Sequence, residues 1–176
     1  MFSLNHLGLT VGSIPSLILI FVWFCLLRWV RYSGWGIAIL TLIGTISHEI
    51  LHAAVGWMVY AKPTSFSIIP RRGKNYWMLG SVGFRNLNIW NSAPVAFAPL
   101  LLAWVSWFIF NHWTQSAFQN GDYMSWIVSG YVAAVALFSC LPSHIDIKMG
   151  ALSALMYGCI ACLIWLGVFQ FHRLLA

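Results

Sequence analysis

The stretch His48-Glu49-Ile50-Leu51-His52 combines two histidines with one of the three acidic residues in this 176-residue chain. It lies in a long apolar segment, where a charge costs at least ~2.5–3.5 kcal/mol and therefore suggests a function. On a helix, His48 and His52 lie one turn apart on one face, so both imidazoles can reach one metal ion. Glu49 then projects beside the ion, where it can take a proton from a bound water. The spacing predicts a metal centre on a membrane helix.

The composition is that of an integral membrane protein. Hydrophobic residues make up 61% of the chain and charged residues 7%, with a mean hydropathy of +0.83, whereas soluble domains carry roughly a quarter charged residues. The formal net charge is +6, but the basic residues flank apolar runs, which favours topology signals over a nucleic-acid partner. We expect residues 1–176 to form a single membrane domain that contacts the lipid bilayer. The sequence gives no indication of the oligomeric state.

Five apolar segments have about the length of a membrane helix, which needs ~20 residues. They are residues 14–30, 34–60, 92–110, 124–141 and 149–171. Between the second and third lies a basic segment with prolines and glycines, in which two short apolar runs flank a turn. This pattern predicts a β-hairpin at the membrane surface. The expected fold is an all-α membrane protein, a bundle of about five transmembrane helices with a small cytoplasmic β-hairpin region.

The basic residues predict the orientation of the bundle. Five spans place the 61–90 segment and the helix break at 142–148 on the same side of the membrane. That side carries six Lys/Arg residues and the other side three. By the positive-inside rule, the hairpin faces the cytoplasm. We therefore expect a multi-pass protein of the cell (inner) membrane, with its active site toward the cytoplasm.

A catalytic zinc site takes three protein ligands and a water molecule, so a third ligand is required. Asp146 follows the helix-breaking Pro142 on the predicted cytoplasmic side, and its carboxylate can point into the bundle. It can instead cap the following helix. His144 is the rival donor, and otherwise a candidate catalytic residue that supports the ligands or stabilises an oxyanion. The other acid and histidines, which lie on the opposite side or near the chain ends, are His6, His112, Asp122 and His172.

These features resemble the site-2 protease-like family of intramembrane zinc metalloproteases. The resemblance covers residues 34–150 and rests on the HExxH sequence in a membrane helix, the hairpin that follows, and an Asp-containing motif two spans later. It implies a Zn²⁺ cofactor held by His48, His52 and Asp146, with Glu49 as the base. It also implies a hydrolase, a metalloprotease that cleaves membrane proteins or peptides within the bilayer near the cytoplasmic face. An edge strand of the hairpin can then hold an unwound substrate by β-addition.

Two other hypotheses remain open. His48 and His52 can serve a haem or di-iron membrane oxidoreductase, although di-iron enzymes need more clustered histidines than this chain has. The same cluster can also be structural, in a non-catalytic metal-binding membrane subunit. An absorbance spectrum separates the first alternative from a zinc enzyme. The second predicts that Glu49→Gln leaves the function intact.

Overall fold

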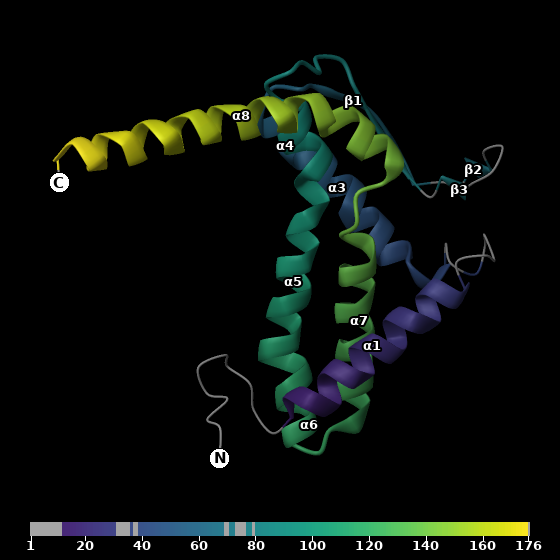
Figure 1. Ribbon diagram of the computed structural model, residues 1–176. Coiled ribbons are helices and arrows are strands. Elements are labelled where there is room, and N and C mark those ends of the chain that lie inside the picture. Colours follow the sequence, from purple (N-terminus) through teal and green to yellow (C-terminus); the bar gives the residue numbers. More distant parts are fainter. Residues whose placement is uncertain are drawn as a thin grey trace.

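The computed structural model describes residues 12–30, 36, 39–68, 71–72, 77–78 and 80–175, and the side chains at all of these except 71–72, 77–78 and 169–175. Most of this part of the chain is helical (Figure 1). The helices are α1 (Ser13–Val30), α3 (Leu42–Met58), α4 (Ser92–Phe97), a 3-10 turn (Ala98–Leu100), α5 (Leu101–Ile109), a π-helical turn (Phe110–Thr114), α6 (Gln115–Gln119), α7 (Tyr123–Ser139) and α8 (His144–Leu175). The strands are β1 (Pro63–Ser67), β2 (Arg71–Arg72), β3 (Trp77–Met78) and β4 (Ser81–Phe84). His6 and the side chain of His172 lie outside the described residues.

Three helical stretches of the described chain are long and apolar enough to cross a membrane, namely Ser13–Val30, Ser92–Gln119 and His144–Val168. The apolar helix α7 is shorter. α3 has 17 residues and covers the later part of the predicted 34–60 segment, whose beginning lies partly outside the described residues. The predicted helical, membrane-type fold is thus confirmed in this coarser form, with three rather than five described helices that meet the length and hydropathy of a span.

Between the predicted spans 92–110 and 124–141, the chain stays helical to the end of α6 instead of leaving the helix after residue 110. α5 continues through the π-helical turn into α6 without a break. The polar side chains of this stretch find partners within the bundle. Gln115 donates Nε2–H to Asn111 Oδ1 (3.1 Å), and its Oε1 accepts the hydroxyl of Ser13 on α1 (2.6 Å). A helix can carry such residues because their hydrogen bonds are satisfied inside the protein.

The core of the bundle lies between α1, α5 and α7. In Figure 1, α5 and α7 run alongside each other and α1 crosses them. The buried apolar side chains at this junction are Ile20, Leu27, Ile109, Phe110, Ala133, Ala134 and Val135. The alanines of α7 allow close approach of the neighbouring backbones, which is how helices associate where lipid removes the hydrophobic drive between them.

The predicted hairpin region is confirmed as two small antiparallel sheets. β1 pairs with β4, and β2 pairs with β3. α3 ends in a Schellman motif, in which the N–H of Ala61 donates to Gly56 O (2.7 Å) and the N–H of Tyr60 to Trp57 O (3.2 Å). Tyr60 takes the left-handed conformation (φ 58°) that this motif requires. The turn sends the chain back along α3, so that β4 packs against that helix.

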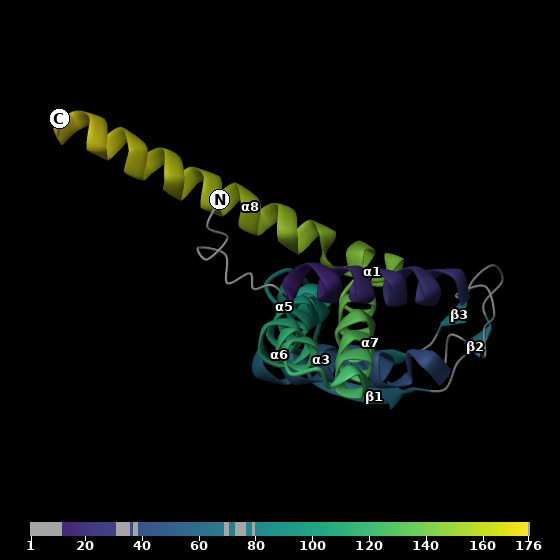
Figure 2. The same ribbon diagram turned by 90° about the horizontal axis from the view of Figure 1, so that it is seen from below.

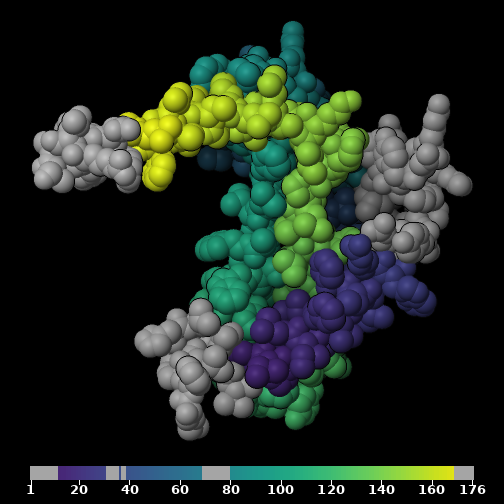
Figure 3. All heavy atoms as spheres, in the orientation of Figure 1, coloured from purple at the N-terminus to yellow at the C-terminus, as the bar shows by residue number. Residues whose placement is uncertain are grey.

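α8 starts at the predicted break. Ser143 and Asp146 form a capping box, in which the N–H of Ser143 donates to Asp146 Oδ2 (2.7 Å) and the N–H of Asp146 to Ser143 Oγ (3.2 Å). The first turns then pack on α4, where Ser153 Oγ accepts the N–H of Ala93 (3.1 Å). Beyond this contact, α8 leaves the bundle (Figures 1 and 2). In Figure 3 it stands apart from the body of the molecule as an arm.

Candidate metal centre

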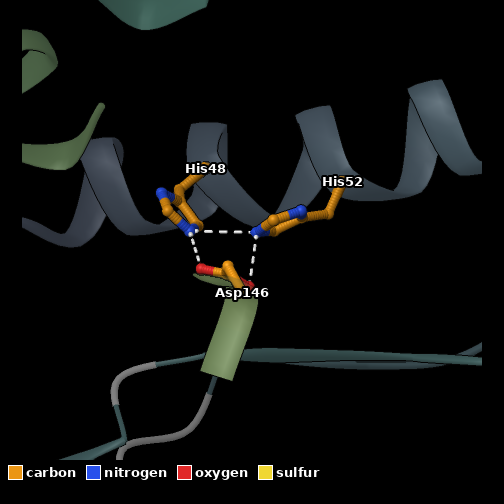
Figure 4. Close-up of side chains that lie close together, drawn as sticks. All are labelled: His48, His52 and Asp146. Atoms are coloured by element: carbon orange, nitrogen blue, oxygen red, sulfur yellow. Dashed lines mark hydrogen bonds and ion pairs between the residues drawn. The ribbon is translucent and has the colours of Figure 1, made fainter. Parts of the chain in front are cut away.

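Two histidines of α3 and one aspartate of α8 meet where the two helices approach each other (Figure 4). The Nε2 atom of His48 lies 3.6 Å from Asp146 Oδ2, and that of His52 lies 3.3 Å from Asp146 Oδ1. The two Nε2 atoms are 3.1 Å apart. One potential ligand atom from each residue therefore falls within 4.8 Å of the others, which is close enough to hold one metal ion. Within the described residues, no further group of three His, Cys, Asp or Glu has this arrangement.

The backbone fixes which ring nitrogen of each histidine is available. Nδ1 of His48 lies 2.6 Å from the carbonyl oxygen of Ser139, and Nδ1 of His52 lies 2.7 Å from that of Val95. A carbonyl oxygen only accepts hydrogen bonds, so each Nδ1 is the protonated nitrogen. In a neutral imidazole, Nε2 is then left with a lone pair. Both Nε2 lone pairs are thus available at the place where the carboxylate of Asp146 arrives.

This convergence calls for a cation. Two Nε2 acceptors and a carboxylate, within 3.6 Å of one another, bring together lone pairs that repel. A metal ion or an added proton between them turns the repulsion into attraction. Histidine ligands in metal sites usually donate their other N–H to a carbonyl or carboxylate, as both histidines do here. The set of two imidazoles and one carboxylate could hold a metal ion.

The structure brings Asp146, and not His144, to the two histidines. Its carboxylate also accepts the N–H of Ser143 (2.7 Å), so capping and contact with the histidines occur together. The two roles weighed in the sequence are therefore compatible, and the capping bond orients the oxygen that faces His48. The side chain of His144 is exposed and lines the same cavity. Ser143, which supports Asp146, was not among the residues predicted from the sequence, although its spacing from Asp146 is a capping-box pattern.

Burial distinguishes this cluster from ordinary surface charges. Glu49 is 7% exposed, His52 4% and Asp146 8%. A buried carboxylate is costly unless it is paired or binds a cation. Two of the three acidic residues of the chain share one buried location with two imidazoles. A haem or di-iron centre here needs further histidines, and none of the described ones joins the group.

A cavity of about 630 Å³ opens beside the cluster. Its polar wall includes His48, Glu49, His52 and Asp146, together with Ser81, the first residue of β4, and Gly80, which precedes it. The apolar wall consists of Val82, Phe84, Phe138, Leu141, Ile145 and Met149. Glu49 thus faces the same space as the histidines, as the HExxH spacing predicts. The arrangement can hold a cation next to a carboxylate and offer an apolar surface to whatever enters.

The remaining acid lies at the other end of the bundle. Asp122 is the N-cap of α7, where its Oδ1 accepts the N–H of Ser125 (3.1 Å). Its side chain and that of His112 are exposed. Neither residue belongs to the cluster of His48, His52 and Asp146. That both face the opposite side of the membrane stays a prediction.

We compared the chain with known proteins. No protein-family model, no curated protein and no solved structure matches this chain. The chemistry of the site therefore rests on its own residues.

Proposed function

We propose that this chain is a zinc-dependent intramembrane endopeptidase of the site-2 protease-like type, which hydrolyses peptide bonds of membrane-embedded proteins near the cytoplasmic face. The observation that carries the proposal is the convergence of two Nε2 lone pairs and a carboxylate in a buried cavity that Glu49 also lines. Two imidazoles and one carboxylate are a ligand set typical of catalytic zinc, with a position left for water.

The residues divide the work as follows. His48, His52 and Asp146 hold the ion, and the carbonyl oxygens behind the imidazoles keep their rings oriented. Bound there, zinc would polarise the scissile carbonyl and lower the pKa of a water molecule. Glu49 takes the proton of the attacking water on a carboxylate oxygen and later gives it to the leaving amine nitrogen. His144, at the rim of the cavity, donates a hydrogen bond to the oxyanion.

An apolar, extended substrate suits the walls of the cavity. The side chains opposite the cluster are aliphatic or aromatic, as a segment taken from a membrane helix requires. β4 pairs with β1 along one edge, and in the described sheet its second edge has no partner strand. A substrate segment that adds to this edge has its backbone held straight across the cavity. Extension matters because a helical peptide bond is shielded from attack by its own hydrogen bonds.

The membrane arrangement is part of the proposal. We infer a bundle in which α1, α3, the α4–α6 helix, α7 and α8 all enter the bilayer, with the hairpin in the cytoplasm. Thr64 of β1 is exposed, and so is Asn120 beyond α6. The test uses intact cells that express this chain, which we propose to be a multi-pass inner-membrane protein. The Asn120→Cys variant should react with an impermeant maleimide, and the Thr64→Cys variant should not. Labelling of Thr64→Cys alone would reverse the orientation.

Cleavage of a defined peptide tests the activity. The probe is a synthetic apolar peptide of ~20 residues, with a fluorophore and a quencher at its ends, in detergent micelles with the purified full chain. We expect zinc-loaded protein to cleave it, a chelator to stop cleavage, and added zinc to restore it. Mass spectrometry then locates the broken bond. A zinc-loaded protein that leaves this peptide and a panel of natural membrane-protein segments intact contradicts the proposal.

A further inference from the structure

Gly80 lies directly against the side chain of Glu49, one residue before β4 begins. A β-carbon at position 80 would stand 2.6 Å from Oε1, 2.7 Å from Cγ and 2.9 Å from Cδ of Glu49. Unbonded carbon atoms prefer separations of about 3.5–4.0 Å. Any residue other than glycine therefore displaces either the Glu49 carboxylate or the backbone that passes over it.

The backbone at position 80 is not free to withdraw. At the far end of β4, the ring of Phe84 packs on Gly56 so closely that a β-carbon at position 56 would lie 2.4 Å from Phe84 Cε1. Positions 49 and 56 are two turns apart on the same face of α3. Both ends of this segment, Gly80 and Phe84 of β4, therefore contact the same face of α3. The part of α3 between these two contacts also carries His52. A shift of Gly80 away from Glu49 would therefore disturb the packing of Phe84 on Gly56.

Glu49 is confined from this side. It is buried, and a glutamate side chain has more rotamer freedom than most. The backbone of Gly80, which carries no side chain, packs on Cγ, Cδ and Oε1 of Glu49. This contact excludes the Glu49 rotamers that point toward the hairpin. The remaining ones direct the carboxylate into the cavity with His48.

We infer that Gly80 is a positioning residue, whose bare backbone holds the Glu49 carboxylate in the cavity beside the two histidines. The contact itself is independent of any activity, whereas its effect on turnover rests on the proposed function. Gly80 would then couple the hairpin to the reaction, because any movement of β4 is felt at the proton-transferring carboxylate.

A disulfide tests the contact without any substrate. The β-carbon of Glu49 is one bond beyond the Cγ that lies 2.7 Å from the position-80 β-carbon, within reach of the ~3.5–4.5 Å that a disulfide needs. Mild oxidation of the purified Glu49→Cys/Gly80→Cys double variant should form this bond, mapped by mass spectrometry. Glu49→Cys/Gly83→Cys is the control, because Gly83 packs on Ser65 of β1. Equal cross-linking of both pairs, or of neither, overturns the inference.

The consequence is tested with Gly80→Ala. The matched control is Gly130→Ala in α7, where a new β-carbon is equally crowded, 2.5 Å from Leu19 Cδ2, but far from the cavity. With the fluorogenic peptide, Gly80→Ala should keep its zinc and its KM within about twofold and lose at least tenfold in kcat, since base catalysis contributes ~10²–10⁴-fold. Gly130→Ala should keep kcat. A Gly80→Ala variant with the kcat of the wild type overturns the inference.

A spectroscopic readout separates this inference from the proposed function. In protein loaded with Co²⁺, the visible absorption reports on groups next to the metal. Gly80→Ala and Glu49→Gln should change that spectrum in the same direction, and Gly130→Ala should leave it as in the wild type. If the wild type cleaves no peptide but the three variants show these spectra, the peptidase proposal fails and the positioning role stands. A Gly80→Ala spectrum identical to the wild type contradicts the positioning role.

Discussion

Asp122 and Asp146 each stand at the start of a helix, and each accepts a backbone N–H there. Asp122 bonds to Ser125 (3.1 Å) at the start of α7, and Asp146 bonds to Ser143 (2.7 Å) at the start of α8. The difference lies in what the fold brings to the second oxygen. Asp122 stays exposed, whereas Asp146 is buried and lies 3.3 Å from Nε2 of His52. An acidic residue at the start of a helix therefore does not indicate a function by itself. Burial of that residue against two imidazoles does indicate one.

The two ends of the bundle consequently differ in what their acids do. At the α7 end, a carboxylate caps a helix. At the α8 end, Asp146 caps a helix and also faces two histidines beside Glu49. Substitutions at the α8 end should affect metal binding and turnover, whereas those at the α7 end should affect stability alone. Four substitutions, taken from the largest expected effect to the smallest, test this difference.

Glu49→Gln should produce the largest effect. The amide keeps the size and a hydrogen-bonding end but cannot take the proton, so kcat for the fluorogenic peptide should fall by ~10²–10⁴. Zinc content should not change, because Glu49 is not one of the proposed ligands. Asp122→Asn is the matched acid-to-amide control and should keep full activity. An active Glu49→Gln protein contradicts the proposed mechanism.

His144→Ala should lower turnover and keep the metal. If His144 donates to the oxyanion, its loss should cost ~10²–10³ in kcat, while the zinc content measured by elemental analysis stays at the level of the wild type. Loss of zinc in this variant, with zinc retained in Asp146→Asn, would instead move the third ligand to His144.

Ser143→Ala should weaken metal binding to a smaller degree. The backbone N–H to Asp146 remains, but the reciprocal bond from Asp146 N–H to Ser143 Oγ (3.2 Å) is lost, and the start of α8 becomes less fixed. Residues that support metal ligands typically contribute 10–100-fold to metal affinity. Competition with a zinc-sensitive dye measures the change. An unchanged affinity would show that α8 holds Asp146 in place without this cap.

Asp122→Ala should produce the smallest effect, confined to stability. Loss of the cap should lower the Tm by about 2–4 °C, with zinc content and kcat unchanged. Hydrogen bonds from the side chain and backbone of Ser125 lower the pKa of the Asp122 carboxyl. The stability that this provides is present above the ordinary pKa of ~3.9 and is lost as the pH falls through the lower folded value. The difference in Tm should therefore shrink in acid, and a fall in zinc content would be unexpected.

The parts of the molecule that follow from local spacing were predictable from the sequence. His48 and His52 share a helix face because they are four residues apart, and the Pro-Ser break places Asp146 at a helix start. The pairing of β1 with β4 follows from two short apolar runs around a turn. The histidine spacing and the Pro-Ser break are signals that lie within a few residues of the chain. The strands β1 and β4 are farther apart, but both flank the same turn region, so their pairing could be predicted without knowledge of any other contact.

Other parts depend on contacts that leave no pattern in the sequence. The carbonyls of Val95 and Ser139 orient the histidines, and a backbone oxygen carries no residue signature. The side chain of Gln115, in α6, is paired with Ser13, which lies far away in the chain. The direction of α8 was also not predictable, because a helix that is apolar all round has no face that indicates its neighbour.

Elemental analysis of purified protein tests the central claim most directly, which is that His48, His52 and Asp146 together hold one metal ion. The wild type and Asp122→Ala should each contain about one zinc per chain, whereas Asp146→Ala and His48→Ala should contain close to none. Circular dichroism should show equal helix content in all four proteins. Wild-type protein that cleaves its substrate without bound metal, or an Asp146→Ala protein with as much zinc as Asp122→Ala, would contradict the account.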